Sequence, residues 1–188
     1  MSSPISWLKN ADTLREPNPG GFAIWGAFAT LLRFVHENNW SGACHSVSAV
    51  LHILLRTQKV ESALYIGEVG FDKLAFDHSW VEVEGQVYDA AVSSTLIHSI
   101  SFPPVFRGID LTTMTLTALR YGIQSGQGYD PSAKMIAQSP VAQYMDAFPH
   151  HPKGLIGLAA DLAKKSGISA SSGALRKAAE QSAWRERA

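Results

Sequence analysis

Apolar residues recur at helical spacing in two consecutive segments near the start of the chain. In the segment from 22 to 37 they are Ile24, Phe28, Leu31 and Val35. In the segment that follows Ser41 they are Val47, Val50, Leu51 and Leu54. This spacing places each set on one face of a helix, so it predicts two amphipathic helices. Ser41 is the expected N-cap of the second helix, which leaves Cys44 in its first turn.

The pattern changes to that of β-strands after residue 61. Three runs that are rich in β-branched and aromatic residues predict strands: SALYIGEVGF at 62–71, DHSWVEVEG at 77–85 and QVYDAAV at 86–92. Between the last two runs, Glu84-Gly85 predicts a two-residue hairpin turn, which sets residue 83 opposite residue 86. The first half of the chain therefore reads as two helices followed by three strands.

This hairpin register decides which side chains share a face of the sheet. His78, Trp80 and Asp89 fall on one face, whereas Val81 and Tyr88 fall on the core side. His78 and Asp89 become diagonal neighbours, about 7–8 Å apart between backbones, within reach of a carboxylate–imidazole hydrogen bond. A slip of one residue would put the pair on opposite faces of the sheet.

The rest of the chain has weaker signals. Residues 1–21 read as an irregular lead-in, and Asp110 is expected to cap a short helix that runs to Tyr121. Asp130-Pro131 predicts a helix start, and Pro140 must end or kink that helix. A weak helix follows at 155–165, then a Ser/Gly linker at 166–173 and a charged helix at 174–188. We therefore expect one domain at 1–150 with its core at 22–97, and a helical extension at 151–188 that is mobile or binds a protein partner.

Composition and charge exclude some classes of function. The 188 residues carry sixteen basic and sixteen acidic side chains without a basic block, which disfavours a nucleic-acid partner. The longest apolar run, FAIWGAFATLLRFV, is short for a bilayer and contains Arg33, so we expect no membrane span. A single cysteine forms no internal disulfide, and the first residues lack a secretory pattern. Cytoplasmic localisation is the expectation.

Cys44 is the residue on which function depends. A cysteine is nucleophilic as the thiolate, and its pKa falls at a helix N-terminus and beside a histidine. His78 is the candidate base, and Asp89 is the candidate group that orients it. A lone cysteine near a helix start is more often a small buried apolar residue, so both interpretations stay open on the residues alone.

The other histidines carry weaker hypotheses. His45 follows Cys44 directly, but adjacent helix residues point about 100° apart, so it is not expected to be the base. His45 and His52 lie two turns apart on the helix, yet the chain has no H-E-x-x-H motif and no second cysteine, so no metal is predicted. Asp72 and Asp77 are reserve carboxylates near the site.

Two segments of the chain resemble a known family. GACHSVSAVLHILLRTQKVESALYIGEV and DHSWVEVEGQVYDAA resemble the core of the transglutaminase-like superfamily, within the papain-like cysteine fold. The tight second motif looks most like small bacterial members such as the peptidases that remove leaders in lasso-peptide maturation. The resemblance implies an α+β fold, with a nucleophile helix packed on a small antiparallel sheet and additional helices after it. It covers roughly residues 40–92.

The resemblance also implies the chemistry. Cys44 would be the nucleophile, His78 the general base and acid, and Asp89 the orienting residue, in hydrolysis of a peptide or protein amide through a thioester, with no cofactor. The Cys44 N–H and a second donor would meet the oxyanion. Candidates for that donor or for the pocket are Asn39, Asn38, Trp40 and Trp80. The alternatives are transfer to an amine, as in a transglutaminase, and a non-catalytic binding or assembly module.

Overall fold

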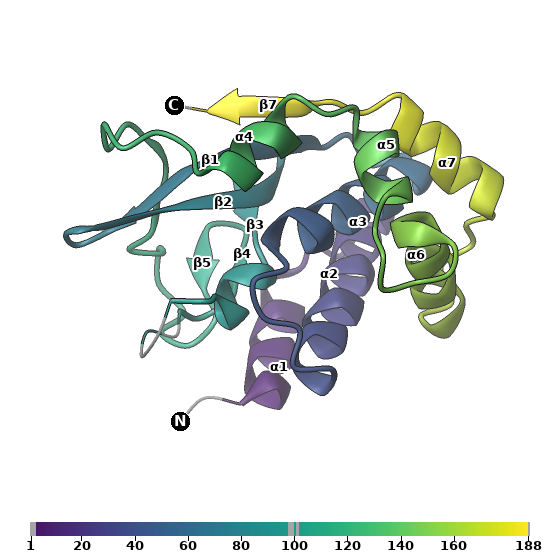
Figure 1. The fold of residues 1–188 in the computed structure, drawn as a ribbon. Helices are drawn as coiled ribbons and strands as arrows, with labels where there is room; N and C mark the ends of the chain where they lie inside the picture. The colour runs from purple at the N-terminus through teal and green to yellow at the C-terminus, as the bar shows by residue number, and fades with distance from the viewer. Residues whose placement is uncertain (1–2, 98–99, 101, 188) are drawn as a thin grey trace.

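Helices form the first third of the chain and strands follow, as the change of period predicts. The computed structural model describes residues 3–97, 100 and 102–187, and Figure 1 shows an α+β arrangement in which helices surround one side of a twisted sheet. The leading elements are α1 (Pro4–Leu14), α2 (Pro19–Glu37), α3 (Cys44–Thr57), β1 (Ala63–Phe71), β2 (Leu74–Val83), β3 (Gln86–Tyr88) and the short helix η1 (Ala91–Ser94). The later elements are β4 (Val105–Phe106), β5 (Ile109–Asp110), β6 (Arg120–Ile123), α4 (Pro131–Ala137), α5 (Val141–Asp146), α6 (Gly154–Lys165), α7 (Ser172–Glu180) and β7 (Trp184–Arg187).

The expectation of an irregular lead-in was wrong. Residues 4–14 form α1, and the reason lies in its first turn. The Ser3 side chain accepts a hydrogen bond from the Ser6 N–H, and the Ser6 side chain accepts one from the Ser3 N–H. Pro4 occupies the first helical position, where its missing N–H costs nothing. The helix buries Trp7 and Ala11 against the core.

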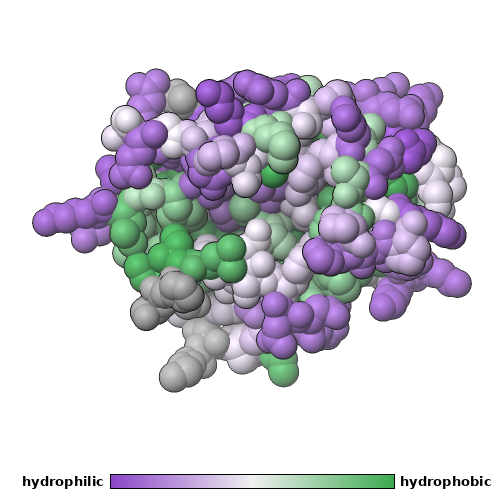
Figure 2. Space-filling view, viewed as in Figure 1, coloured by the Kyte–Doolittle hydropathy of each residue, from purple (hydrophilic) through white to green (hydrophobic). Residues whose placement is uncertain are grey.

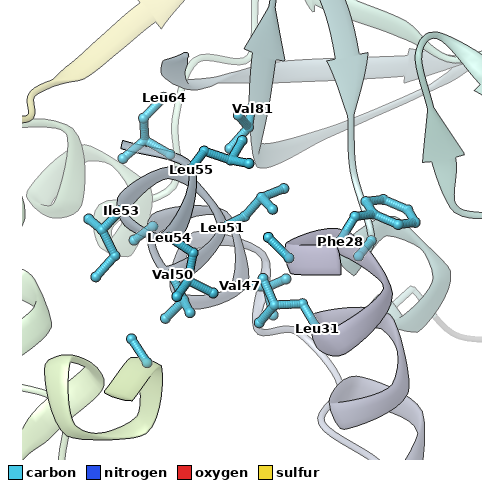
Figure 3. Close-up of a cluster of buried hydrophobic side chains, with 14 of the residues drawn as sticks. Phe28, Leu31, Val47, Val50, Leu51, Ile53, Leu54, Leu55, Leu64 and Val81 are labelled. Carbon is cyan, nitrogen blue, oxygen red and sulfur yellow. The ribbon is translucent and has the colours of Figure 1, made fainter. Parts of the chain in front are cut away.

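Helix α3 is the centre of the hydrophobic core. It contacts β1 and β2 on one side and α2, α6 and α7 on the others, and Figure 3 shows its apolar side chains pointing outward in several directions. Every residue from 46 to 55 is buried, which is wider than the single stripe that the sequence predicts. The N-cap is Ala43 and not Ser41, and no side chain caps the first turn.

The main sheet has the predicted hairpin at one end. Strand β2 pairs antiparallel with β3, with Val83 opposite Gln86 and Val81 opposite Tyr88, so the predicted register is confirmed. Glu84 and Gly85 both have positive φ, which the tight turn requires and which favours glycine at the second position. The strand order is β3-β2-β1-β6, and β7 pairs parallel with β1.

The helix expected from Asp110 to Tyr121 was also wrong. Asp110 does cap a turn, because its Oδ1 accepts hydrogen bonds from the N–H groups of Thr112 and Thr113. No helix follows, and the chain instead enters β6, which pairs with β1. The many threonines of this stretch favour extended backbone over helix, and pairing with β1 gives that backbone its hydrogen-bond partners.

The C-terminal segment belongs to the same core as the rest. Asp130 caps α4 as predicted, and Pro140 is the N-cap of α5. Helices α6 and α7 bury their apolar faces in the central cluster. The helix expected at 174–188 was wrong in its second half, because α7 ends at Glu180 and residues 184–187 form β7, which pairs with β1. The expected linker at 166–173 is a short turn that already contains the start of α7, and residue 188 lies outside the described part. None of the described helices is long and apolar enough to cross a membrane.

Candidate active site

A cleft opens where the start of α3 meets β2. Its volume is about 390 Å³. Helix α3 and the turn before it contribute one wall, β2 the second, the segment after η1 the third and the start of α4 the fourth. The lining residues are Gly42, Cys44, His45, Phe76, Asp77, His78, Ala91, Ser94, Thr95, Leu96, Ile97, Asp130 and Ser132. The cleft thus holds the cysteine and the histidine that the sequence analysis singled out.

Cys44 is the first residue of α3 and is partly exposed to the cleft. The first turn of a helix has N–H groups without intrahelical partners, and these favour a negative charge there. No side chain caps this turn, so its N–H groups remain available to a negative charge on the Cys44 sulfur. The position therefore stabilises a thiolate.

His78 and Asp89 form a buried pair behind the cysteine. Nε2 of His78 donates a hydrogen bond of 2.7 Å to Oδ2 of Asp89, and both side chains are almost fully buried. Oδ1 of Asp89 accepts hydrogen bonds from the N–H groups of Ala91 and Val92, each 3.0 Å. These bonds hold the carboxylate, which holds the imidazole, so Nδ1 is the ring nitrogen left for the Cys44 sulfur.

The electrostatics of the pair favour charge separation. Burial raises the pKa of the Cys44 thiol, but the charge and hydrogen bonding of His45 and His78 outweigh burial and lower this pKa to about 5. Burial lowers the pKa of His78, but the charges of Asp89 and Cys44 outweigh it and raise this pKa to about 10. Between these values the thiolate–imidazolium form predominates.

Tyr121 completes the surroundings of Asp89 and was missed by the sequence analysis. Its hydroxyl donates a 2.9 Å hydrogen bond to Oδ2 of Asp89, and burial raises the pKa of this phenol well above its usual value. Tyr121 comes from β6, in the stretch expected to be helical. No local pattern could have connected it with Asp89, because the contact depends on the pairing of β6 with β1.

The candidates for the second oxyanion donor lie outside the cleft lining. Trp40 packs against Phe34 and Phe148. Trp80 is fully buried, stacks on Tyr65 and donates its indole N–H to Glu82. Both are therefore engaged elsewhere.

The asparagine candidates are also outside this lining. Asn39 is an exposed residue with positive φ in the turn after α2. The Asn38 side chain donates to the backbone carbonyl of Phe34. Neither amide is among the groups that face the cleft.

The two histidines of α3 have different surroundings. His45 lines the cleft beside Cys44, and its Nδ1 forms a 2.7 Å hydrogen bond with Oγ of Ser79. His52 is held by Ser62 at Nδ1 and by Ser182 at Nε2. Among the described residues no three histidine, cysteine or acidic side chains are grouped in a way that would hold a metal ion.

The two sides of the cleft differ in polarity. Phe76, Leu96 and Ile97 form an apolar side, and the space-filling view shows an apolar area below the β1–β2 hairpin (Figure 2). Asp77 and Asp130 form an acidic side, in which the Asp130 N–H donates to Oδ2 of Asp77. Burial raises the pKa of Asp77.

Comparison with known proteins adds no family to this geometry. No family model, curated protein or solved structure matches the chain. The described structure establishes an α+β fold in which a helix-start cysteine shares a cleft with a histidine that is hydrogen-bonded to a buried aspartate.

Proposed function

We propose that the protein is a cysteine-dependent acyl-transfer enzyme that hydrolyses an amide or peptide bond. Cys44 is the nucleophile, His78 the general base and acid, and Asp89 the residue that orients the imidazole. The observation that carries this proposal is the buried 2.7 Å hydrogen bond from His78 to Asp89 beside a partly exposed cysteine whose pKa is lowered to about 5. Perturbed groups that converge in one cleft are typical of catalytic sites.

The order of elements supports a papain-like, transglutaminase-like fold for the core. The nucleophile begins a helix, the histidine lies on a strand packed against that helix, and the aspartate directly follows the next strand. The segments that resemble the superfamily include all three residues. We propose on this basis that the chain belongs to the superfamily and acts on a peptide or protein amide.

The first half of the reaction forms a thioester. The Cys44 thiolate attacks the carbonyl carbon of the amide, and the electrons of the C=O π bond move to the oxygen. Collapse of this intermediate re-forms the C=O bond and breaks the C–N bond. The His78 imidazolium gives the Nδ1 proton to the leaving amine, and Asp89 keeps the ring oriented through Nε2.

The second half releases the acyl group. Neutral His78 takes a proton from a water molecule, whose oxygen attacks the thioester carbonyl carbon. Collapse breaks the C–S bond, so that the carboxylic acid leaves and the thiolate forms again beside the imidazolium. The cleft beside Cys44 gives the water access to the thioester.

The test is acylation by p-nitrophenyl acetate combined with alkylation by iodoacetamide. We expect one acetyl group on Cys44 by mass spectrometry, and an alkylation midpoint near pH 5 that rises by more than two pH units in His78→Ala. His150→Ala, at an exposed histidine outside the cleft lining, is the matched control. An unacylated Cys44 whose alkylation follows an ordinary thiol near pH 8.5 would refute the proposal.

A second candidate function is transfer of the acyl group to an amine. Asp77 and Asp130 line the cleft, and within the described chain neither forms an ion pair with a lysine or arginine. Carboxylates beside the thioester attract a cationic amine, which gives one proton to neutral His78 before its nitrogen attacks the thioester carbon. This charge complementarity is what favours an amine acceptor over water.

The two acceptors can be separated by product analysis. The acetyl-enzyme is mixed with cadaverine, and the ratio of N-acetylcadaverine to acetate is measured. Asp130→Asn removes the charge but keeps the cap of α4, because asparagine is an equally good N-cap. A ratio that falls in this variant supports amine transfer, and acetate alone in the wild type supports hydrolysis.

A further inference from the structure

One histidine of the cleft lining has no role in the proposed reaction. His45 lies beside Cys44, and its ring is fixed on two sides. Nδ1 is 2.7 Å from Oγ of Ser79, and the ring of Trp184 lies 6.2 Å away at an interplanar angle of 89°. Of the titratable groups around it, Cys44 and Asp77 both sense its charge. These contacts fix the orientation of the ring.

Ser79 decides which nitrogen of His45 carries a proton. The Ser79 side chain is fully buried on β2, and within the described chain His45 Nδ1 is the partner of its hydroxyl. If Nδ1 donated to Ser79, the hydroxyl hydrogen would be left buried without an acceptor, which costs about 1–3 kcal/mol. The stable arrangement has the hydroxyl donating to Nδ1, which is then the unprotonated nitrogen of the neutral ring.

This assignment makes Nε2 a constant donor. The neutral ring with unprotonated Nδ1 carries its hydrogen on Nε2, and the imidazolium also carries a hydrogen there. Only the opposite tautomer lacks it, and the buried Ser79 hydroxyl disfavours that tautomer. The charge and hydrogen bonding of His45 act on the Cys44 thiol, which fits a donor that faces the sulfur.

We infer that His45 is the second hydrogen-bond donor of the site: its Nε2–H stabilises the Cys44 thiolate at rest and the oxyanion after attack. The residues expected for this task, Asn39, Trp40 and Trp80, lie outside the cleft lining, whereas His45 lies within it. The thiolate part rests on the place of His45 in the cleft lining, on its bond to Ser79 and on its effect on the Cys44 thiol, and the oxyanion part rests on the proposed function.

The tautomer can be measured directly. In ¹⁵N-histidine NMR at a pH where the His45 ring is neutral, we expect its signals to show a protonated Nε2 and a hydrogen-bond-accepting Nδ1. In Ser79→Ala this preference should be lost, because the fixing hydroxyl is absent. A wild-type His45 with its hydrogen on Nδ1 would overturn the inference.

Alkylation tests the donor function without any substrate. His45→Phe keeps a flat ring beside Trp184 but has no donor, so we expect the alkylation midpoint to rise by about one pH unit and the iodoacetamide rate at pH 4 to fall about tenfold. His45→Gln, which retains an amide donor, should recover part of the loss. His52→Gln is the matched control on the same helix. An unshifted midpoint in a folded His45→Phe protein would show that His45 is only structural.

The oxyanion part is measured at a pH where both proteins carry the thiolate. At pH 8 we expect acetylation of His45→Phe by p-nitrophenyl acetate to be slower than that of wild type by tenfold or more, since one oxyanion donor contributes about 10²–10³ in rate. Equal acetylation rates would refute this part. If wild type is not acetylated at all, the proposed function fails, and the tautomer and the alkylation midpoint still decide whether His45 is a donor.

Discussion

Replacing Asp89 by asparagine changes one atom at the centre of the site. Oδ1 of the new side chain still accepts from the N–H groups of Ala91 and Val92. The other oxygen becomes an NH₂ group, which faces two donors, Nε2–H of His78 and the hydroxyl of Tyr121. The substitution therefore removes the buried negative charge and places three hydrogen-bond donors together without an acceptor.

Two magnitudes follow from this geometry. Burying donors without an acceptor costs about 1–3 kcal/mol of unfolding free energy, and each kcal/mol lowers Tm by about 2–4 °C for a chain of this size. Loss of the Asp89 charge lowers the pKa of His78, so His78 no longer stabilises the thiolate. A rise of the Cys44 pKa from about 5 to about 7 reduces the thiolate fraction at pH 6 from about 90% to about 10%.

The assay is the iodoacetamide rate from pH 4 to 10, with circular dichroism to confirm the fold. We expect Asp89→Asn to react about tenfold more slowly than wild type at pH 6 and at a similar rate at pH 9. Asp110→Asn is the matched control, because Asp110 also accepts two backbone N–H groups through Oδ1 but lies outside the cleft lining. If a folded Asp89→Asn protein kept the wild-type profile, Asp89 would not control the charge of the pair.

Three further predictions concern stability. Burial is the main cause that lowers the pKa of His52 to about 4, so the unfolded chain takes up this proton below pH about 6.5 and the native state only near pH 4. The contribution of neutral His52 to the free energy of unfolding is complete above pH about 6.5 and falls by about 3 kcal/mol towards pH 4. When the free energy of unfolding in urea is measured against pH, the proton uptake on unfolding should be smaller by one proton in His52→Gln. Leu54→Ala, at a fully buried position, should lose about 2–5 kcal/mol in urea unfolding, whereas Leu116→Ala, at a residue that is 78% exposed, should change stability by less than about 0.5 kcal/mol; equal losses would contradict the burial argument. Gly42→Ala should cost about 1–2 kcal/mol, since Gly42 has a φ of +68°, and an unchanged Tm would show that the turn can adopt another backbone conformation.

Much of the local structure around the site could be predicted from the sequence. The acidic-Gly turn and the alternation of apolar residues determine the β2–β3 register, and this register puts His78 and Asp89 on one face. The helical spacing after Ser41 places Cys44 in the first turn of α3. These signals act between residues that are near in sequence, so they need no knowledge of the rest of the fold.

The elements that were missed depend on contacts between distant segments. Threonine-rich residues near 115 favour extended backbone, but only pairing with β1 gives β6 and its Tyr121 their place in the sheet. Strand β7 likewise forms only because β1 offers it an edge. The backbone N–H and C=O groups of such segments form hydrogen bonds with the partners that the folded core provides. A short stretch of sequence therefore cannot predict their secondary structure.

The sequence by itself therefore determined the candidate residues Cys44, His78 and Asp89 and the local element on which each lies. The tertiary structure decided which of them meet. Packing of α3 against β2 brings Cys44 to His78, and the same packing sets His45 against Ser79. The physical reason is that helical and strand periods arise within a few residues, whereas the approach of a helix start to a strand is set by burial of the whole core.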